Sequence, residues 1–269
     1  MISVKWLVEK YKFNRTTKLL PAEIRKQGMQ VKIINTSIDG SFQTNLFKDK
    51  DCVIAYTTIR TARKIQQHAV WVPGIYCNFR ELSCDYYYPR LKPYLFNNHF
   101  YIIPFGNLSN NVLFHSGEDL FIRPVKGGKE FFAKTVNNID EYIEKHQHLL
   151  PETLLLVSCK KIIKREWRLV VSDHVLTGSR YSTKKELSST DDVVPPQEVI
   201  DFGNHVLKNI NFSPDPIWTL DICEGEDDTL SVLEVNSFSC AGLYHSDLSI
   251  IVEEVAKIAK KDYEDIYAY

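Results

Sequence analysis

The sequence predicts an α/β protein in two parts, a small open parallel α/β domain over residues 1–98 and an α+β domain over residues 99–269. Two observations support this division. In the first part, short apolar segments alternate with segments of helical periodicity, which is typical of βαβ units and a parallel sheet. In the second part, short polar turns join neighbouring strand-like segments, which favours antiparallel hairpins.

The first domain is expected to combine short strands with two helices. Apolar, largely β-branched segments predict the strands, and apolar residues at helical spacing predict the helices. The expected strands cover residues 4–8, 31–34, 52–56 and 70–76, and the expected helices cover residues 19–27 and 59–69. Pro21 near the start of the first helix and Gly28 directly after it fit the ends of this helix.

Residues 77–120 carry the weakest pattern. Tyr86, Tyr87 and Tyr88 form an aromatic run that favours a packed junction between the two domains. The alternative is a platform on which bases stack, but such platforms combine aromatic residues with a basic stripe, and no such stripe accompanies the run. A strand over residues 99–104 is expected to lead into the second domain.

The second domain is expected to contain three helices among its hairpins. The expected strands cover residues 120–125, 130–134, 154–158, 162–171, 175–181, 217–223 and 230–236. The expected helices cover residues 139–150, 199–210 and a final segment that follows Asp247. Asn138 and Asp247 are suitable N-cap residues because their side chains accept hydrogen bonds from exposed backbone N–H groups.

The composition is that of an ordinary globular protein. The chain has 269 residues, of which 44% are hydrophobic and 25% charged, and its formal net charge is −1. A balanced charge argues against nucleic acid as the main partner, because binding to phosphate backbones requires a strong positive field. The sequence carries no pattern that indicates an oligomeric state.

The cysteines and the N-terminal segment indicate a cytoplasmic protein. None of the six cysteines forms a Cys-x-x-Cys pair or has zinc-finger spacing, and four of them (Cys52, Cys77, Cys159, Cys223) lie in apolar or strand-like segments. We therefore expect buried, reduced thiols. The first residues lack the pattern of a signal peptide. No apolar run is long enough for a membrane span.

The strongest functional pattern is Asp221 together with Glu234 and Asn236. Alternation along a strand places Glu234 and Asn236 on one face, with Leu230 and Val232, while Leu233 and Val235 point to the other. Buried oxygens are costly without a partner, and Mg²⁺ accepts carboxylate, amide and phosphate oxygens together. The alternative is that the two side chains end a strand and face water.

A second pattern surrounds the Gly127-Gly128 turn. Four cations flank it, Arg123, Lys126, Lys129 and Lys134. Glycines allow backbone amides to approach a phosphate, and the cations would neutralise its charge. The turn has neither the Walker spacing nor the Gly-x-Gly-x-x-Gly spacing. A plain hairpin with solvent-facing lysines remains the alternative.

A third pattern is Glu166-Trp167-Arg168 on a strand. Glu166 and Arg168 share one face, where an arginine can bind a carboxylate or a phosphate with two parallel hydrogen bonds. Arg180 lies on the partner strand of the hairpin, from which it can face the same cleft. The alternative is an ion pair within an exposed strand.

Together, the three patterns resemble the ATP-grasp superfamily of carboxylate–amine ligases. The order is Arg-Pro, a glycine–lysine turn, Glu-x-Arg, Asp and then Glu-x-Asn, and the resemblance covers residues 100–269. The separation of 13 residues between Asp221 and Glu234 is similar to that of the family's metal motif. More narrowly, the sequence resembles the clade that is marked by two arginines and a lysine and is often found in phage and bacterial proteins. Arg123, Lys129 and Arg168 match the marker positions.

The resemblance implies a role for each candidate residue. The implied ATP-binding residues are Arg123, Lys129, Lys134, Val157, Ser158, Cys159 and Glu166. The implied Mg²⁺ ligands are Asp221, Glu234 and Asn236. Residues 156–162 would form a hinge whose backbone reads adenine, although many members have Glu where Cys159 stands. Arg168 and Arg180 would act in catalysis, and Ser239 and Gly242 would bind the acyl substrate.

The resemblance also implies an activity. We expect an ATP-dependent ligase that forms an amide or peptide bond between a carboxylate and an amine through an acyl phosphate, with ATP and Mg²⁺, releasing ADP and phosphate. The substrates would be small molecules or a peptide or protein terminus, and no membrane is involved. The alternative is a regulatory or degenerate ATP- and Mg²⁺-binding module without ligase activity.

Overall fold

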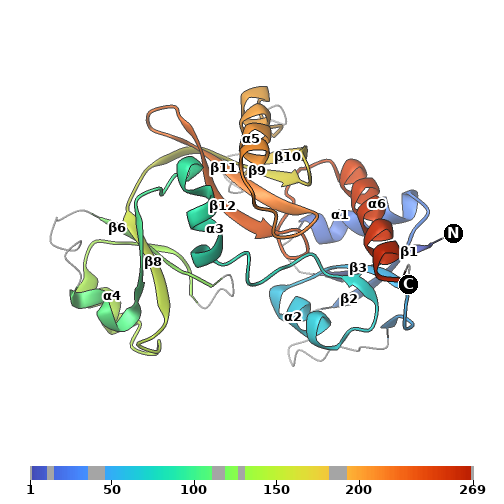
Figure 1. Ribbon diagram of the computed structural model, residues 1–269, viewed down its shortest axis with the longest axis horizontal. Helices are drawn as coiled ribbons and strands as arrows, with labels where there is room; N and C mark the ends of the chain where they lie inside the picture. The colour runs from blue at the N-terminus through green and yellow to red at the C-terminus, as the bar shows by residue number, and fades with distance from the viewer. Residues whose placement is uncertain are drawn as a thin grey trace.

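The computed structural model describes residues 2–10, 15–35, 46–110, 119–126, 131–181 and 193–267. Within these ranges the strands form three four-stranded sheets. The first sheet is parallel and precedes two antiparallel sheets in the chain, which confirms the predicted α/β class. Figure 1 shows the three sheets as successive parts of an elongated molecule, with the first sheet beside both chain ends.

The first sheet has the strand order β2-β1-β3-β4 and matches the sequence prediction. Its elements are β1 (Val4–Lys10), α1 (Arg15–Lys26), β2 (Gln30–Asn35), β3 (Cys52–Tyr56), α2 (Ile59–His68) and β4 (Val72–Gly74). Helices cover both faces of β1, because Trp6 packs in the core that contains α1 whereas Leu7 packs in the core that contains α2. Burial on both faces explains the apolar run Trp6-Leu7-Val8 in the middle of the strand.

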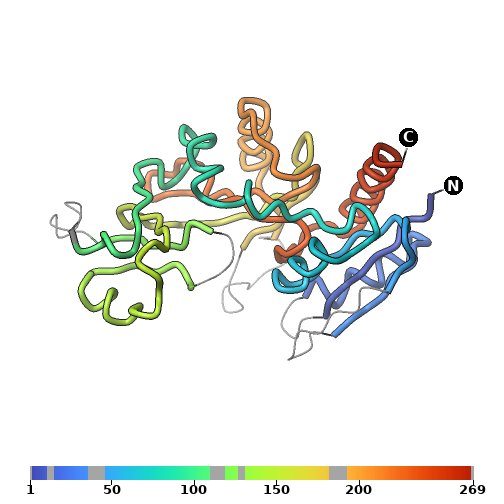
Figure 2. The backbone as a smooth tube through the Cα atoms, turned by 60° about the horizontal axis from the view of Figure 1, so that its bottom comes forward, coloured from blue at the N-terminus to red at the C-terminus, as the bar shows by residue number. Residues whose placement is uncertain are grey.

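The last helix, α6 (Leu248–Tyr267), packs on this first sheet. Its apolar residues join Trp6 in one core, and Figure 2 shows the two ends of the chain close together. Asp247 caps the helix as predicted, since its Oδ1 accepts the N–H groups of Ser249 and Ile250. This core therefore crosses the predicted boundary between residues 98 and 99.

The second sheet, with the order β10-β9-β11-β12, forms the middle of the molecule. Its strands are β9 (Ile163–Val171), β10 (Val175–Tyr181), β11 (Trp218–Gly225) and β12 (Leu230–Ser237). One face, which carries Trp167, Leu169 and Leu220, packs against α5 (Gln197–Asn209) and α3 (Cys84–Leu91). The other face carries Arg168 and Asp221, which the register places directly opposite each other.

The third sheet, with the order β5-β8-β6-β7, lies at the end of the molecule away from the chain termini. Its strands are β5 (Phe100–Pro104), β6 (Leu120–Pro124), β7 (Lys134–Val136) and β8 (Leu154–Cys159). The helix α4 (Ile139–Lys145) covers one face, and the 3₁₀ segments η2 (Lys92–Tyr94) and η3 (Phe105–Asn110) flank β5. Asn138 caps α4 as predicted, because its side chain accepts the N–H group of Glu141.

Three elements depart from the sequence prediction. The strand expected over 130–134 begins only at Lys134, and the expected Lys126–Lys129 turn lies largely outside the described residues. The helix expected to reach residue 150 ends at Lys145, because the C-cap residue His146 leaves helical geometry, with a φ of −117° and a ψ of 20°. Helix α3 was not predicted, because Tyr and Pro are weak helix formers and the burial of Tyr87 and Tyr88 stabilises it instead.

The thiols mostly follow the expectation. Cys52, Cys77 and Cys223 are buried, but Cys159 is exposed. Cys159 is the last residue of β8, where the strand leaves the core. Among the described residues, no helix is long and apolar enough to cross a membrane.

Leu220→Ala tests the central core. Leu220 is 0% exposed in the middle of β11. Its truncation leaves a cavity that should lower the free energy of unfolding by about 2–5 kcal/mol. Urea denaturation measures this loss. Leu19→Ala is the matched control, because Leu19 is 44% exposed and its truncation removes little buried area. Equal losses in both variants would contradict the assignment of Leu220 to the core.

Candidate functional site

A row of charged side chains crosses strands β9, β11 and β12 of the second sheet. Arg168 of β9 lies opposite Asp221 of β11, and Asp221 lies opposite Glu234 of β12. Directly opposed residues share a face, so the three side chains stand next to one another. This face is the one that α5 does not cover.

Arg168 and Asp221 form a buried, two-point ion pair. Arg168 Nε donates to Asp221 Oδ1 at 2.7 Å, and Nη2 donates to Oδ2 at 2.5 Å. The side chains are 9% and 1% exposed. Arg168 Nη1 also donates to the carbonyl oxygen of Gly242 at 3.1 Å. The guanidinium group is therefore fixed in position and direction.

Asn236 joins the two carboxylates. Its Nδ2 donates to Glu234 Oε1 at 2.9 Å and to Asp221 Oδ2 at 3.2 Å. Glu234 and Asn236 thus share a face, as the sequence predicts. These two hydrogen bonds bring the three predicted Mg²⁺ ligands together.

The predicted position of Val232 on the same face as Glu234 is wrong. The register pairs Asp221 with Glu234 but Ile222 with Val232, which leaves Leu233 as the extra residue of a β-bulge. Val232 and Val235 consequently pack in the same core, on the α5 side of the sheet. A bulge changes the facing of every residue beyond it, and alternation alone does not reveal it.

Arg123 reaches the row from the third sheet. Arg123 lies on β6, and its Nη2 is 3.0 Å from Glu234 Oε2. Glu234 Oε1 is 3.9 Å from Nη2 of Arg168. Glu234 therefore lies between two arginines that come from different sheets. The Nε atom of Arg123 is buried and has no hydrogen-bond partner within the described part of the chain.

The environment moves the pKa values of the two carboxyl groups in opposite directions. Burial raises the pKa of Asp221 to about 6, although Arg168 favours its charged form. Burial also opposes the charge of Glu234, but Arg123, Asn236 and Arg168 outweigh it and lower the pKa of Glu234. Glu234 is therefore held as a carboxylate.

Glu166 lies two residues before Arg168 on the same strand and is half-buried. Burial raises the pKa of Glu166 to about 8, and the negative charges of Asp221 and Glu234 add to this effect. Its carboxyl group is therefore largely protonated near neutral pH and can donate a hydrogen bond. The sequence predicts its face but gives no indication of this protonation.

Tyr244 belongs to the site and was not predicted. The guanidinium carbon of Arg168 lies 5.2 Å from the centre of the Tyr244 ring, and Tyr181 contacts the same ring edge to face. The backbone of Tyr244 adopts a φ of 48°, a conformation that is rare for a residue with a bulky side chain. No sequence pattern identifies this residue, because the turn between Phe238 and Asp247 has no periodicity.

The predicted hinge residues lie on both faces of β8. Ser158 is opposite Phe121, so it shares the face of Arg123, whereas Val157 packs in the core under α4. Ser158 Oγ is buried without a hydrogen-bond partner among the described residues. Because side chains alternate along a strand, Cys159 lies on the same face of β8 as Val157. Only Ser158 is therefore placed to use its side chain on the site face.

Two predicted cations, Arg180 and Lys134, are not part of the cluster. Arg180 lies opposite Trp167, which places it on the face of the second sheet away from Arg168. Lys134 is exposed and lies opposite Ile122, on the α4 face of the third sheet. Lys129 lies outside the described residues.

Ser239 and Gly242 have different surroundings. Ser239 is fully buried and holds the segments that follow β3 and β4. Its carbonyl oxygen accepts the N–H group of Thr57 at 2.8 Å, and its Oγ accepts the N–H group of Tyr76 at 2.9 Å. Gly242 contacts Arg168 through its carbonyl oxygen. Gly242 thus borders the cluster, whereas the contacts of Ser239 are structural.

The donor set fits a hard cation bound together with phosphate. Two carboxylates and one amide converge on adjacent strands, and oxygen ligands of this kind suit Mg²⁺. Within the described ranges, no group of three or more His, Cys, Asp or Glu side chains forms a metal site by itself. Beside it, the buried Arg123 Nε and Ser158 Oγ have no hydrogen-bond partner among the described residues.

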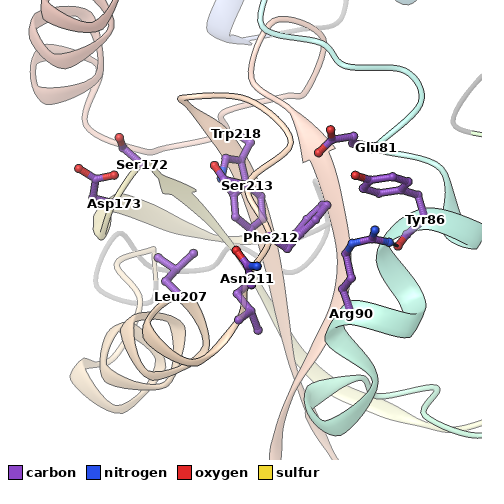
Figure 3. A pocket seen from close by; sticks show the side chains of 11 residues that line it. Glu81, Tyr86, Arg90, Ser172, Asp173, Leu207, Asn211, Phe212, Ser213 and Trp218 are labelled. Carbon is purple, nitrogen blue, oxygen red and sulfur yellow. Dashed lines mark hydrogen bonds between the residues drawn. The ribbon is translucent and has the colours of Figure 1, made fainter.

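Two open grooves lie away from this cluster. One, of about 510 Å³, lies between α3, α5 and the β9–β10 turn and is lined by residues that include Tyr86, Arg90 and Trp218 (Figure 3). The other, of about 580 Å³, borders the hinge at Lys160 and Lys161. The candidate ligands of Mg²⁺ line neither groove.

Comparison with solved structures identifies the fold. The D-cycloserine synthetase DcsG aligns with a TM-score of 0.64 at 10% identity, covering 96% of this chain and 100% of that one. D-alanyl-alanine synthetase A from Vibrio cholerae aligns with a TM-score of 0.64 at 10% identity, covering 98% and 100%. The ATP-grasp ligase PsnB, complexed with a minimal precursor, gives 0.59 at 12% identity, with 96% and 99% covered.

Comparison of sequences gives the family. No curated protein sequence matches the chain. A family model matches residues 103–255, which is more than half of the chain, and it describes the ATP-grasp domain of family 3 in the clade named for two arginines and a lysine. This range contains Arg123, Arg168 and the Asp221–Asn236 cluster. The chain belongs to family 3 of this ATP-grasp clade.

Proposed function

We propose that the protein is an ATP-dependent carboxylate–amine ligase that works through an acyl phosphate and releases ADP and phosphate. The observation that carries the proposal is the cluster of Asp221, Glu234 and Asn236 between Arg168 and Arg123. It combines oxygen ligands for a cation with fixed positive groups for phosphate. Family membership supports the same function.

Each member of the cluster has a distinct task in this proposal. Asp221, Glu234 and Asn236 hold Mg²⁺, which when bound neutralises charge on the terminal phosphates of ATP. Arg123 faces the phosphates from the third sheet. Arg168, fixed by Asp221, Gly242 and Tyr244, binds the transferred phosphoryl group and steadies the acyl phosphate while the amine attacks.

The remaining candidates have weaker support. Glu166, with its raised pKa, would hydrogen-bond a hydroxyl or phosphate oxygen of ATP. The backbone of residues 156–162 and Ser158 Oγ would bind adenine. Lys129 remains a proposed ATP ligand from the turn, whereas Lys134 would reach ATP only from the α4 face of the third sheet, away from Arg123. Arg180 would reach the substrate only from the edge strand, because its register position faces the other way.

The substrates are proposed to be amino acids or a peptide. Solved neighbours include a D-alanyl-alanine synthetase and a ligase complexed with a precursor peptide. Both substrates would approach Arg168 from the side of Gly242. The alternative is an ATP- and Mg²⁺-binding module without ligase activity, which would bind ATP but release no ADP in the presence of any carboxylate and amine.

Product analysis tests the reaction. We expect a library of carboxylates and amines to contain a pair that stimulates ADP release, with inorganic phosphate as the second product. ³¹P NMR of that reaction distinguishes this mechanism from adenylation. Pyrophosphate among the products would refute the acyl phosphate. A complete lack of stimulated ADP release, with ATP binding intact, would favour the module without ligase activity.

Glu234→Gln tests the Mg²⁺ site. The change preserves shape but removes the charge that faces both arginines, so turnover should fall by about 10²–10³-fold and require more Mg²⁺. Glu226→Gln is the control, because Glu226 is exposed in the turn between β11 and β12. Steady-state rates across a Mg²⁺ titration measure both. Unchanged turnover and Mg²⁺ dependence in Glu234→Gln would reject the assignment.

Arg168→Lys tests the fixed guanidinium group. Lysine keeps the charge but cannot make the two parallel hydrogen bonds to Asp221, so we expect turnover to fall about 10- to 100-fold. Arg165→Lys is a matched control, since Arg165 pairs with Glu224 between the same two strands but is 43% exposed. Turnover in this control should be nearly that of the unmodified protein. An equal fall in turnover in both variants would show that the ion pair of Arg168 with Asp221 has no special function.

A further inference from the structure

The first sheet has a topological switch point between β1 and β3. The strand order β2-β1-β3-β4 places these two strands side by side, and the chain leaves them toward opposite faces, to α1 from β1 and to α2 from β3. In open α/β sheets, ligands bind just outside the carboxyl ends of the strands at such a point. The expected place for a ligand is therefore the edge where β1 ends at Lys10 and β3 ends at Tyr56.

A buried carboxylate lies at this edge. Glu9 is the residue before the last one of β1, and it is 3% exposed. Its Oε2 accepts the N–H group of Thr58, the N-cap residue of α2, at 2.8 Å. Among the described residues, no cation pairs with Glu9, and Oε1 has no hydrogen-bond partner. Oε1 is not one of the fully enclosed polar atoms without a partner, so a small ligand can reach it.

A second carboxylate of the same sheet shows what Glu9 lacks. Asp51 lies directly before β3, at the amino edge of the sheet, and its Oδ1 is 2.6 Å from Nζ of Lys5. Burial removes water from a charged group, and an opposite charge in contact with it offsets that cost. Glu9 is buried more deeply than Asp51 and has no such lysine within the described part of the chain. A bound cation would complete its surroundings.

The N-terminus of α2 does not supply the missing charge in full. A helix N-terminus carries about half a positive charge, and this one already binds Oε2 of Glu9. The remaining negative charge makes the edge favourable for a cation and unfavourable for an anion. The alternative is that Glu9 only caps α2. Capping requires one oxygen atom, which an uncharged glutamine also provides, so charge and capping can be separated by experiment.

The same edge contacts the segment that holds Arg168. Thr57, the first residue after β3, donates its N–H group to the carbonyl oxygen of Ser239 at 2.8 Å. The N–H group of the residue after Gly242 donates to Thr16 Oγ1, in the first turn of α1, at 3.1 Å. Between these two anchors lies Gly242, whose carbonyl oxygen accepts the hydrogen bond from Arg168. The segment that positions Arg168 thus rests on the edge that carries Glu9.

We propose that Glu9 binds the positively charged amino group of the substrate whose carboxylate is activated at Arg168. That substrate is then an amino acid or a peptide rather than a simple carboxylic acid. The inference rests on the proposed function, because it takes the position of the carboxylate from there. Oε1 of Glu9 accepts a hydrogen bond from the amino group, while Oε2 stays bonded to Thr58. Glu9 selects the substrate and takes no part in phosphoryl transfer.

Binding of matched probes to the intact protein tests the proposal without turnover. The probes are amino acids and dipeptides, each paired with the analogue in which hydrogen replaces the amino group. Saturation-transfer NMR measures their affinities in the absence of ATP. We expect at least one amino-bearing probe to bind about 10-fold more tightly than its analogue, because a hydrogen bond to a charged group is lost in the analogue. Glu9→Gln should remove this difference.

Two controls separate the charge of Glu9 from its structural contact. Glu9→Gln keeps an oxygen atom for the Thr58 N–H group, so urea denaturation should show a stability close to that of the unmodified protein. Asp51→Asn is the matched variant, since it removes a carboxylate charge from the same sheet at the other edge. This variant should retain the preference for the amino-bearing probe.

The contrary results are equally clear. The proposal fails if the unmodified protein binds no probe more tightly than its analogue. It also fails if the preference survives Glu9→Gln, or if Asp51→Asn loses it to the same extent. Should Glu9→Gln not fold, Glu9→Asp takes its place, and an unchanged preference on this shorter side chain would overturn the proposal. Because no probe measurement uses ATP, a lack of stimulated ADP release would reject the ligase activity without deciding the role of Glu9.

Discussion

The buried ion pair between Arg168 and Asp221 is the interaction on which the arrangement of the site depends. Asp221 is fully buried, and a carboxylate without a partner at this position would cost several kcal/mol. Arg168 offsets this cost only because the register places the two residues opposite each other. The same guanidinium group then fixes Gly242 and lies against Tyr244, so one pairing determines the position of the loop and of the cluster.

Much of the fold and of the cluster could be predicted from the sequence because both follow from local patterns. Strands such as β3 and β10 have the predicted bounds, because each is a short apolar run whose first and last residues are clear in the sequence. Glu234 and Asn236 share a face because alternation holds over two residues. The convergence with Arg123 follows from the family resemblance, since no local pattern connects residues on different sheets.

The errors arise where a residue's surroundings come from distant segments. The bulge at Leu233 reverses the facing of Val232, and only the pairing with β11 reveals it. Arg180 faces away from Arg168 because a bulge between Val175 and Thr177 shifts the register of β10 against β9, which the composition of the hairpin does not reveal. Ser239 has a structural task that depends on Tyr76, a residue of the other half of the chain.

The docking of α6 on the first sheet has a consequence for synthesis of the chain on the ribosome. The strands β1 to β4 emerge first, but α6 is the last helix to emerge and supplies part of the core around Trp6. Until then, the face of the sheet that α6 covers has no complete core and exposes apolar side chains. The first sheet therefore cannot mature independently as the chain grows, and its stability is acquired together with that of the second half of the chain.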